Sequence, residues 1–318
     1  MLNPEIKDEE FLKKPIIIIG SGRSGTTIIS EIIFQHELLA WHNNYQEIFT
    51  HSTHINYLRR FFDNKAWRLI KFWKFVGFSK NTRQKWGTYL NFVIFNPVEL
   101  YRFWEYVSGP RIDFSRGFLL NEKVTPEEKK FIRSFLAKQV KYQGRKRLII
   151  KFTGPGRLEY LTSIMPDALI VNVVREPLAT IRSWLEVGFW QRMGINKLWW
   201  LGAYTLKEEA QAEKLKNDPA LITAFQYKKL METTEYEIKK LGLNVCEVHY
   251  EDFVNGPKSF IQKLMTFMEL PPSKYVDRYM ENISVSNRNT RSSLKSQFSE
   301  ETKKKIMEIV APCQSINP

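Results

Sequence analysis

The segment GSGRSGTT, from Gly20 to Thr27, constrains the fold of this chain more than any other feature. Its glycines have the spacing G-x-x-x-x-G. They follow a short β-branched run typical of a buried parallel strand, Ile16 to Ile19, and precede a predicted helix, Thr26 to His36. Glycines let the backbone turn tightly, so that amide N–H groups and the helix N-terminus point at one anion. The segment is therefore predicted to cradle a phosphate group; a tight turn without a ligand is the alternative.

The rest of the chain alternates predicted strands with predicted helices. Further buried strands are expected at Leu148 to Phe152, Ala168 to Val174 and Asn244 to Tyr250. One helix is expected between a Gly-Pro-Gly turn and Met165, and another begins at Pro177. This alternation predicts an α/β fold, a P-loop-like parallel sheet flanked by helices. The length suits a single domain, residues 1–318.

Residues 55–125 interrupt this alternation with an unusual density of aromatic side chains. We interpret them as a mostly helical insertion, an aromatic-rich cap over one end of the sheet. The cap either packs as the core of a helical subdomain or lines a substrate site. The basic stretch from Arg59 to Lys74 allows another interpretation, an amphipathic helix lying on a membrane surface.

The net charge of +14 and the pI near 9.6 point to an anionic partner. Nucleic acid, an acidic membrane surface and a phosphorylated cofactor all satisfy that charge. No apolar run approaches the roughly 20 residues of a membrane span, and the acidic first ten residues do not resemble a secretory signal. Two cysteines, Cys246 and Cys313, make no disulfide framework. We therefore expect a cytoplasmic protein.

The loop departs from nucleotide-triphosphate loops at one position. Those loops continue with a lysine that reaches the terminal phosphates, whereas here Thr26 takes that place and the cation, Arg23, lies inside the loop. Two later strands end in cations, Lys151 and Arg175, rather than in an acid suited to hold Mg²⁺. Because ligands bind beyond the carboxyl ends of parallel strands, we expect these cations at one site. The pattern predicts a polyanion bound without metal and disfavours hydrolysis of ATP.

A second motif follows the third predicted strand, in the segment VVREPLATIRS from Val173 to Ser183. The guanidinium of Arg175 can donate two hydrogen bonds to a phosphate, and the hydroxyl of Ser183 can donate another. The alternative for Arg175 is an ion pair on the protein surface. Together with GSGRSGTT, this segment resembles the sulfotransferase family that uses 3′-phosphoadenosine 5′-phosphosulfate (PAPS). Ile149 to Pro177 and Val248 to Leu270 are similar to further segments of that family. The loop is similar to that of bacterial small-molecule or carbohydrate sulfotransferases and of tyrosylprotein sulfotransferases.

The resemblance implies that PAPS is the donor, that adenosine 3′,5′-bisphosphate is the product and that no metal is required. The loop would bind the 5′-phosphosulfate and the second motif the 3′-phosphate. A tyrosine and a later polar loop, Ser284 to Lys295, would complete the donor site. The donor contacts implied in this way are Arg23, Ser24, Gly25, Thr26, Thr27, Arg175, Ser183, Tyr250, Arg288, Arg291 and Lys295.

Sulfuryl transfer needs cations at the leaving oxygen and a base for the acceptor proton. Arg23 and Lys151 are the candidate cations. Relatives with this loop use a glutamate about one helix and a turn beyond it, a position that falls near Asn44 here. The nearest carboxylate is Glu47, and two histidines compete with it as the base, His42 and His51.

The acceptor is less constrained than the donor. Six aromatic residues after Ser183 either wall an acceptor pocket or pack two helices together: Trp184, Phe189, Trp190, Trp199, Trp200 and Tyr204. We expect a small-molecule hydroxyl or amine, such as that of an alkaloid natural product in secondary metabolite biosynthesis. A carbohydrate or glycolipid acceptor is the alternative within the family. The alternative outside the sulfotransferase family is a basic protein that binds nucleic acid or a membrane surface. Under the main prediction, a sulfotransferase, we expect no nucleic-acid partner.

Overall fold

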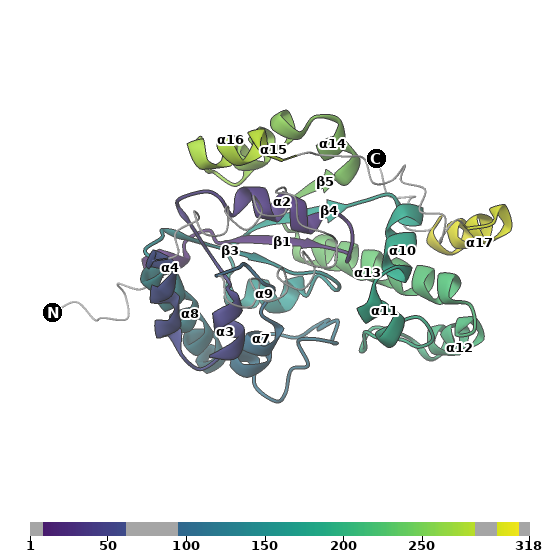
Figure 1. The fold of residues 1–318 in the computed structure, drawn as a ribbon. Helices are drawn as coiled ribbons and strands as arrows, with labels where there is room; N and C mark the ends of the chain where they lie inside the picture. The colour runs from purple at the N-terminus through teal and green to yellow at the C-terminus, as the bar shows by residue number, and fades with distance from the viewer. Residues whose placement is uncertain (1–8, 62–94, 284–297, 312–318) are drawn as a thin grey trace.

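A five-stranded sheet lies at the centre of the computed structural model, which describes residues 9–61, 95–283 and 298–311 (Figure 1). The strand order is β2-β3-β1-β4-β5. The central strand β1 (Ile16–Gly20) pairs in parallel with β3 (Arg147–Lys151) and β4 (Leu169–Val174). The edge strands β2 (Leu39–Trp41) and β5 (Val245–His249) are parallel to their neighbours as well. The predicted α/β class and parallel sheet are confirmed.

Helices cover both faces of this sheet, as Figure 1 shows. On one side lie α2, α14, α15 and α16, and on the other α3, α7, α8 and α9, whereas α10, α11, α12 and α17 lie beside the sheet, to the right in the view. In the described part of the chain no helix is both long and apolar enough to cross a bilayer. The described helices have these bounds: α2 Thr26–Ile33, α3 Asn44–Ile48, η2 Thr53–Tyr57, α4 Leu58–Phe61, α7 Tyr101–Ser108, α8 Pro126–Tyr142, α9 Leu158–Ile164, α10 Pro177–Leu185, α11 Gly188–Met193, α12 Leu206–Leu215, α13 Pro219–Leu241, α14 Tyr250–Asn255, α15 Pro257–Phe267, α16 Lys274–Glu281 and α17 Glu300–Val310, with η1 at Glu10–Leu12.

The isoleucine run of β1 forms a strand because both faces of the sheet are buried. Ile16 and Ile18 pack with α2 and with α14 to α16, and Ile17 and Ile19 pack on the opposite face against α7, α8 and α9. All four isoleucines are at most 1% exposed. A strand that is covered on both faces is apolar at every position, which is why this run did not alternate.

The aromatic stretch contributes part of that core. Phe103 and Trp104 on α7 and Phe114 after it are fully buried, and they pack in the same cluster as Phe152 at the end of β3. Arg59 is buried too, with its guanidinium 3.9 Å from the centroid of the Trp41 ring. The rest of the predicted insertion, residues 62–94, lies outside the described residues, so its role as a cap stays a prediction.

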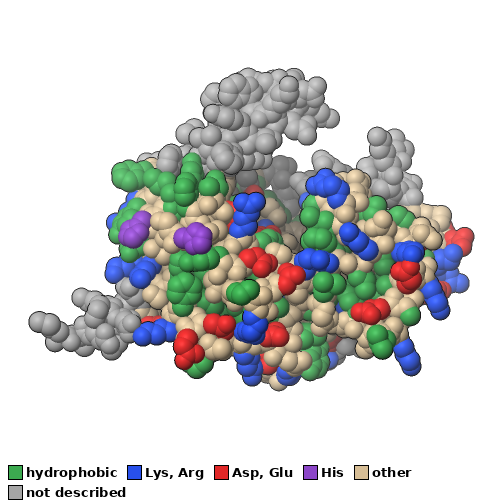
Figure 2. Space-filling view, turned by 90° about the horizontal axis from the view of Figure 1, so that it is seen from below, with side chains coloured by type: hydrophobic (Ala, Val, Ile, Leu, Met, Phe, Trp, Pro, Cys, Tyr) green, Lys and Arg blue, Asp and Glu red, His purple; other side chains and the backbone are tan. Residues whose placement is uncertain are grey.

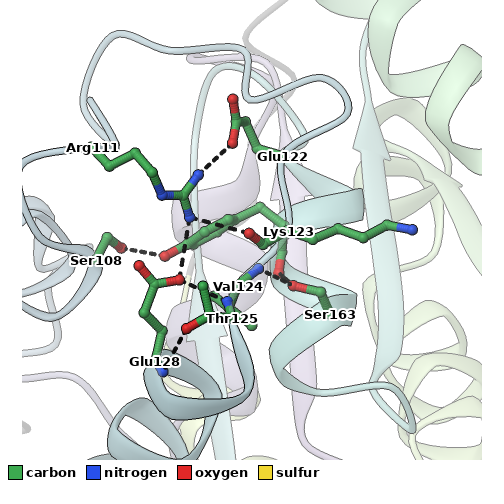
Figure 3. A network of polar contacts seen from close by, with 9 residues as sticks. Ser108, Arg111, Glu122, Lys123, Val124, Thr125, Glu128 and Ser163 are labelled. Carbon is green, nitrogen blue, oxygen red and sulfur yellow. Dashed lines mark hydrogen bonds and ion pairs between the residues drawn. The ribbon is translucent and has the colours of Figure 1, made fainter.

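A polar network anchors the loop between α7 and α8 to the core (Figure 3). The Arg111 guanidinium donates to Glu122 over 2.6 Å and to Glu128 over 3.2 Å. At the end of α7, the Ser108 hydroxyl accepts a 2.7 Å hydrogen bond from the hydroxyl of Tyr160 on α9. These contacts connect three segments of the chain below the sheet.

Candidate functional site

The loop from Gly20 to Thr27 turns sharply between β1 and α2. Gly25 caps the helix with a φ of +94°, a conformation that L side chains rarely adopt. The ring of Tyr250, the first residue of α14, lies directly against Gly25: a Cβ built on this glycine would stand 2.3 Å from Cδ2 of the ring. The first amides of α2 have no carbonyl partner within the helix and open into this loop. The loop therefore places free backbone donors of a helix N-terminus directly after a strand, the arrangement that commonly binds an anion.

The two motifs predicted from the sequence meet in space. Nε of Arg23, inside the loop, donates a 2.9 Å hydrogen bond to the hydroxyl of Ser183 on α10. Nη1 of Arg175, the residue after β4, donates a 2.8 Å hydrogen bond to the Arg23 carbonyl oxygen. Residues more than 150 positions apart thus form one constellation of cations and hydroxyls.

Arg175 is held in a buried position beneath the loop. Its side chain is only 6% exposed, with its guanidinium 4.7 Å from the centroid of the Tyr250 ring. Burial lowers the pKa of Arg175, and the neighbouring cations Arg182 and Arg23 lower it further, although Tyr250 and Glu251 act in the opposite direction. A bound anion would offset both the burial and the repulsion between the cations.

The acid and the proline that follow Arg175 have a local structural role. The Glu176 carboxylate caps α10 by accepting hydrogen bonds from the amides of Leu178 and Ala179 over 2.9 and 2.6 Å. Pro177 occupies the first helical position, where its missing N–H costs nothing. These two residues start the helix immediately after the strand, and the helix carries Ser183 to Arg23.

A cluster of tryptophans supports the loop from below. Nε1 of Trp184 donates to the carbonyl oxygen of Gly22, and its ring is 4.6 Å from Trp190 and 5.5 Å from Trp200, between centroids. The Trp200 ring lies under Gly154, whose amide donates to the Gly20 carbonyl over 3.1 Å.

The sequence suggested that these rings either wall an acceptor pocket or form a core. Trp184, Trp190 and Trp200 are 2, 1 and 7% exposed, so these three form a core. Trp199 and Tyr204 are partly buried around that cluster, and Phe189 is 43% exposed. Trp184 directly follows Ser183 in the sequence, which hints at a place beside the Gly20–Thr27 loop, but the sequence does not show which way its ring points.

Lys151 ends β3 beside the loop. Its ammonium lies 3.4 Å from the Thr27 hydroxyl and forms a 2.8 Å ion pair with the carboxylate of Glu99. Sequence reasoning missed Glu99, because an isolated acid in an aromatic stretch carries no signal for a partner on a distant strand.

Glu47 lies on α3, with one oxygen engaged and the other buried. Oε1 accepts a 3.4 Å hydrogen bond from the amide of Arg102 at the start of α7. Oε2 is buried without a hydrogen-bond partner among the residues that the structure describes. Burial raises the pKa of the Glu47 carboxyl, although Arg102 and the backbone amide of Phe103 partly oppose the shift. A carboxylate with one unoccupied oxygen and a raised pKa has the properties of a general base.

The two histidines that compete with Glu47 occupy opposite environments. His42 is buried, with Nδ1 about 3 Å from the side-chain amide of Gln139. Burial lowers the pKa of His42 to about 3, against a weaker contribution from Gln139 that raises it. His51 is exposed, with its ring 4.1 Å from that of Tyr106.

His42 should make the folding stability depend on pH. Between pH 6.5 and about 3 the unfolded chain binds a proton that the folded chain does not, so stability falls as the pH falls through that window. From pH 7 to pH 5 the unmodified chain is expected to lose about 2 kcal/mol more unfolding free energy than a His42→Gln variant. Urea titrations of both proteins at the two pH values measure this difference, and equal losses would contradict it.

The remaining predicted contacts cannot be placed in the same way. Arg288, Arg291 and Lys295 lie outside the described residues.

Among the residues with a described structure, no group of three or more His, Cys, Asp or Glu side chains is arranged to hold a metal ion. Figure 2 shows Lys and Arg side chains over one face with Asp and Glu among them, not gathered into one basic stripe.

Comparison with known proteins finds a family model that covers part of this constellation. Residues 119–274 match the sequence model described as the sulfotransferase family. Over these residues, just under half of the chain, the sequence is similar to that family. The match includes Lys151, Arg175, Ser183 and Tyr250, whereas the loop around Arg23 precedes it, so the loop is tied to the matched part by its hydrogen bonds to Ser183 and Arg175. Curated protein sequences contain no significant match.

Solved structures support the sulfotransferase fold. Sulfotransferase STF9 from Mycobacterium avium superposes with a TM-score of 0.57 and 14% identity, over 95% of this chain and 77% of that one. The sulfotransferase domain of the curacin biosynthetic pathway gives 0.47 and 13%, over 96% and 99% of the two chains. Retinol dehydratase in a complex with retinol and PAP gives 0.40 and 12%, over 99% and 87%. At 14% identity and a TM-score of 0.57, the superposition on STF9 supports the fold of this chain and nothing finer.

Proposed function

We propose that this sulfotransferase moves the sulfuryl group of PAPS to a hydroxyl or amine of a small molecule. One observation carries the proposal: the 5′ loop and the Arg175 motif are hydrogen-bonded to each other at the carboxyl edge of the sheet. A donor with a phosphosulfate at one end and a 3′-phosphate at the other needs two anion sites of this kind side by side.

Each end of the donor is assigned to a different set of groups. The loop amides and the side chains of Ser24, Thr26 and Thr27 bind the 5′-phosphosulfate, with Arg23 beside them. Arg175 and Ser183 bind the 3′-phosphate. Tyr250 packs against both the loop and Arg175, so it orients the donor. The charges come from arginine and lysine, and no metal is required in this assignment.

The chemistry is an in-line displacement at sulfur. The acceptor oxygen or nitrogen forms a bond to sulfur while the bond from sulfur to the bridging oxygen breaks, and adenosine 3′,5′-bisphosphate leaves. Lys151 and Arg23 stabilise the negative charge that grows on the leaving phosphate. Glu47 takes the acceptor proton. We prefer it to His42 because burial lowers the pKa of His42 to about 3, which makes that ring a weak base, whereas burial raises the pKa of the partly exposed Glu47. We prefer it to His51 because an exposed ring is not screened from water.

The acceptor assignment rests on the resemblance of the loop to those of bacterial small-molecule sulfotransferases. We propose a natural product such as an alkaloid, sulfated in the cytoplasm as part of secondary metabolism. A carbohydrate or glycolipid is the second candidate. A screen of both acceptor classes with ³⁵S-labelled PAPS distinguishes them, because only the true class incorporates label in proportion to enzyme.

Calorimetry with adenosine 3′,5′-bisphosphate tests the donor assignment. The unmodified protein is expected to bind it, and Arg175→Ala to weaken binding at least about 10-fold, since a hydrogen bond to a charged group contributes about 1.5–3 kcal/mol. Arg278→Ala, an exposed arginine on α16, removes the same charge elsewhere and should bind normally. No binding by the unmodified protein would refute the donor assignment. Salt-sensitive binding to DNA or anionic vesicles instead would favour the non-enzymatic class.

A further inference from the structure

We infer that Glu99 is a positioning residue for transfer: it holds the Lys151 ammonium at a fixed point beside the donor loop. This inference rests on the proposed function of the site. The observation behind it is the 2.8 Å ion pair between two side chains that are 13% and 18% exposed, with Thr27 3.4 Å from the same ammonium. The ammonium is therefore held between the loop and an acid that no sequence motif includes.

Glu99 is itself held rigidly. While Oε1 pairs with Lys151, Oε2 accepts hydrogen bonds from the hydroxyl of Thr153 over 2.8 Å and from its amide over 3.2 Å. The Tyr101 hydroxyl lies 2.9 Å from the same oxygen and 2.8 Å from the Thr153 carbonyl oxygen, and it donates to one of the two. Both carboxylate oxygens of Glu99 are thus engaged, Oε1 by Lys151 and Oε2 by Thr153.

The same contacts argue against Glu99 as the general base. Burial would raise the pKa of its carboxyl, but Lys151, Thr153 and Tyr101 together lower it below the ordinary value. A carboxylate that stays ionised and has no unoccupied oxygen is poorly suited to take a proton. Glu47, with a buried and unpartnered Oε2, is better suited.

The need for a positioning residue follows from the chemistry of lysine. Its ammonium is a compact charge on a flexible four-carbon stem, and a charge taken out of water is costly unless it is paired. Between Glu99 and Thr27 the stem loses most of its freedom before the donor binds. Stabilisation of a leaving group depends on such preorganisation, so Glu99 should affect turnover through Lys151 and affect donor affinity little.

A double-mutant cycle on turnover tests this dependence. Glu99→Gln keeps the size of the side chain and is expected to lower kcat about 10- to 100-fold, with the affinity for adenosine 3′,5′-bisphosphate changed less than about threefold. In a Lys151→Met background the same substitution should lower kcat by less than about twofold, because the group that it positions is gone. An equal loss in both backgrounds, or no loss in either, overturns the inference.

A measurement without turnover covers the case in which Lys151→Met is inactive. Heteronuclear NMR of ¹⁵N-lysine-labelled protein should contain an ammonium signal protected from exchange that disappears in Lys151→Met. Glu99→Gln should broaden or abolish that signal while the melting temperature stays within a few degrees. A signal unchanged by Glu99→Gln overturns the inference, even if the bisphosphate binds. Absence of bisphosphate binding by the unmodified protein refutes the proposed function instead.

Discussion

Glu47→Gln is expected to lower kcat by about 10²- to 10⁴-fold, the usual contribution of a general base. Glutamine keeps the shape of the side chain and can still accept the amide hydrogen bond of Arg102, but it cannot take a proton. Affinity for adenosine 3′,5′-bisphosphate should stay within about twofold, because the base acts on the acceptor. Single-turnover rates together with calorimetry separate the two effects.

The pH profile adds a second signature. Because burial raises the pKa of Glu47, the acidic limb of the kcat/KM profile should lie above the range of an ordinary glutamate. Activity falls as the pH drops through that limb, since the protonated carboxyl cannot act as a base, and the limb should vanish from the residual activity of Glu47→Gln.

Three comparison variants complete this test. Glu127→Gln, on an exposed face of α8, removes a carboxylate elsewhere and should be fully active. His42→Gln and His51→Gln test the rival bases. Near-normal turnover of Glu47→Gln would contradict the assignment, and a collapse of turnover in one of the histidine variants would transfer the role to that residue.

Gly25→Ala is expected to weaken binding of adenosine 3′,5′-bisphosphate by more than about 100-fold, because two penalties coincide at this position. The backbone has a φ of +94°, and the new Cβ would stand 2.3 Å from a ring carbon of Tyr250. Either the loop or the Tyr250 ring must move, and both are proposed to contact the donor. Unfolding free energy should fall by about 1–3 kcal/mol.

Gly109→Ala is the matched control for that substitution. Gly109 also has a positive φ, +69°, but a Cβ there meets nothing within 4 Å. With ψ at 178°, this backbone conformation is one that only glycine adopts readily. The alanine variant should therefore have the backbone penalty alone, about 1–3 kcal/mol, with normal donor binding. If Gly25→Ala binds the bisphosphate as well as Gly109→Ala does, the loop is not the donor cradle.

The sheet and the meeting of the two motifs could be predicted because their causes are local. A doubly buried strand is an unbroken apolar run, and the carboxyl ends of parallel strands lie at one edge, which brings Arg23, Lys151 and Arg175 together. The edge strand β2 was not predicted, because three residues, Leu39 to Trp41, are too few to show a pattern.

The remaining features of the site depend on tertiary packing. Glu99 reaches Lys151 only because the segment before α7 passes beside β3, and nothing in the sequence around Glu99 encodes that approach. The tryptophans after Ser183 were compatible with both a pocket and a core, and the choice depends on the side of α10 that faces the loop. Burial distinguishes the environments of Glu47 and His42, and burial is a property of the folded chain.

The hydrogen bonds that Arg23 makes to the second motif also limit how this enzyme can change. Arg23 donates to Ser183 with its side chain and accepts from Arg175 with its backbone carbonyl, so the proposed sulfate end and the proposed 3′-phosphate end of the donor site share a residue. Exchange of the loop for a lysine-bearing one would leave Ser183 without this partner. The two halves of the site can therefore be redesigned only together, and they are expected to diverge in step rather than one at a time.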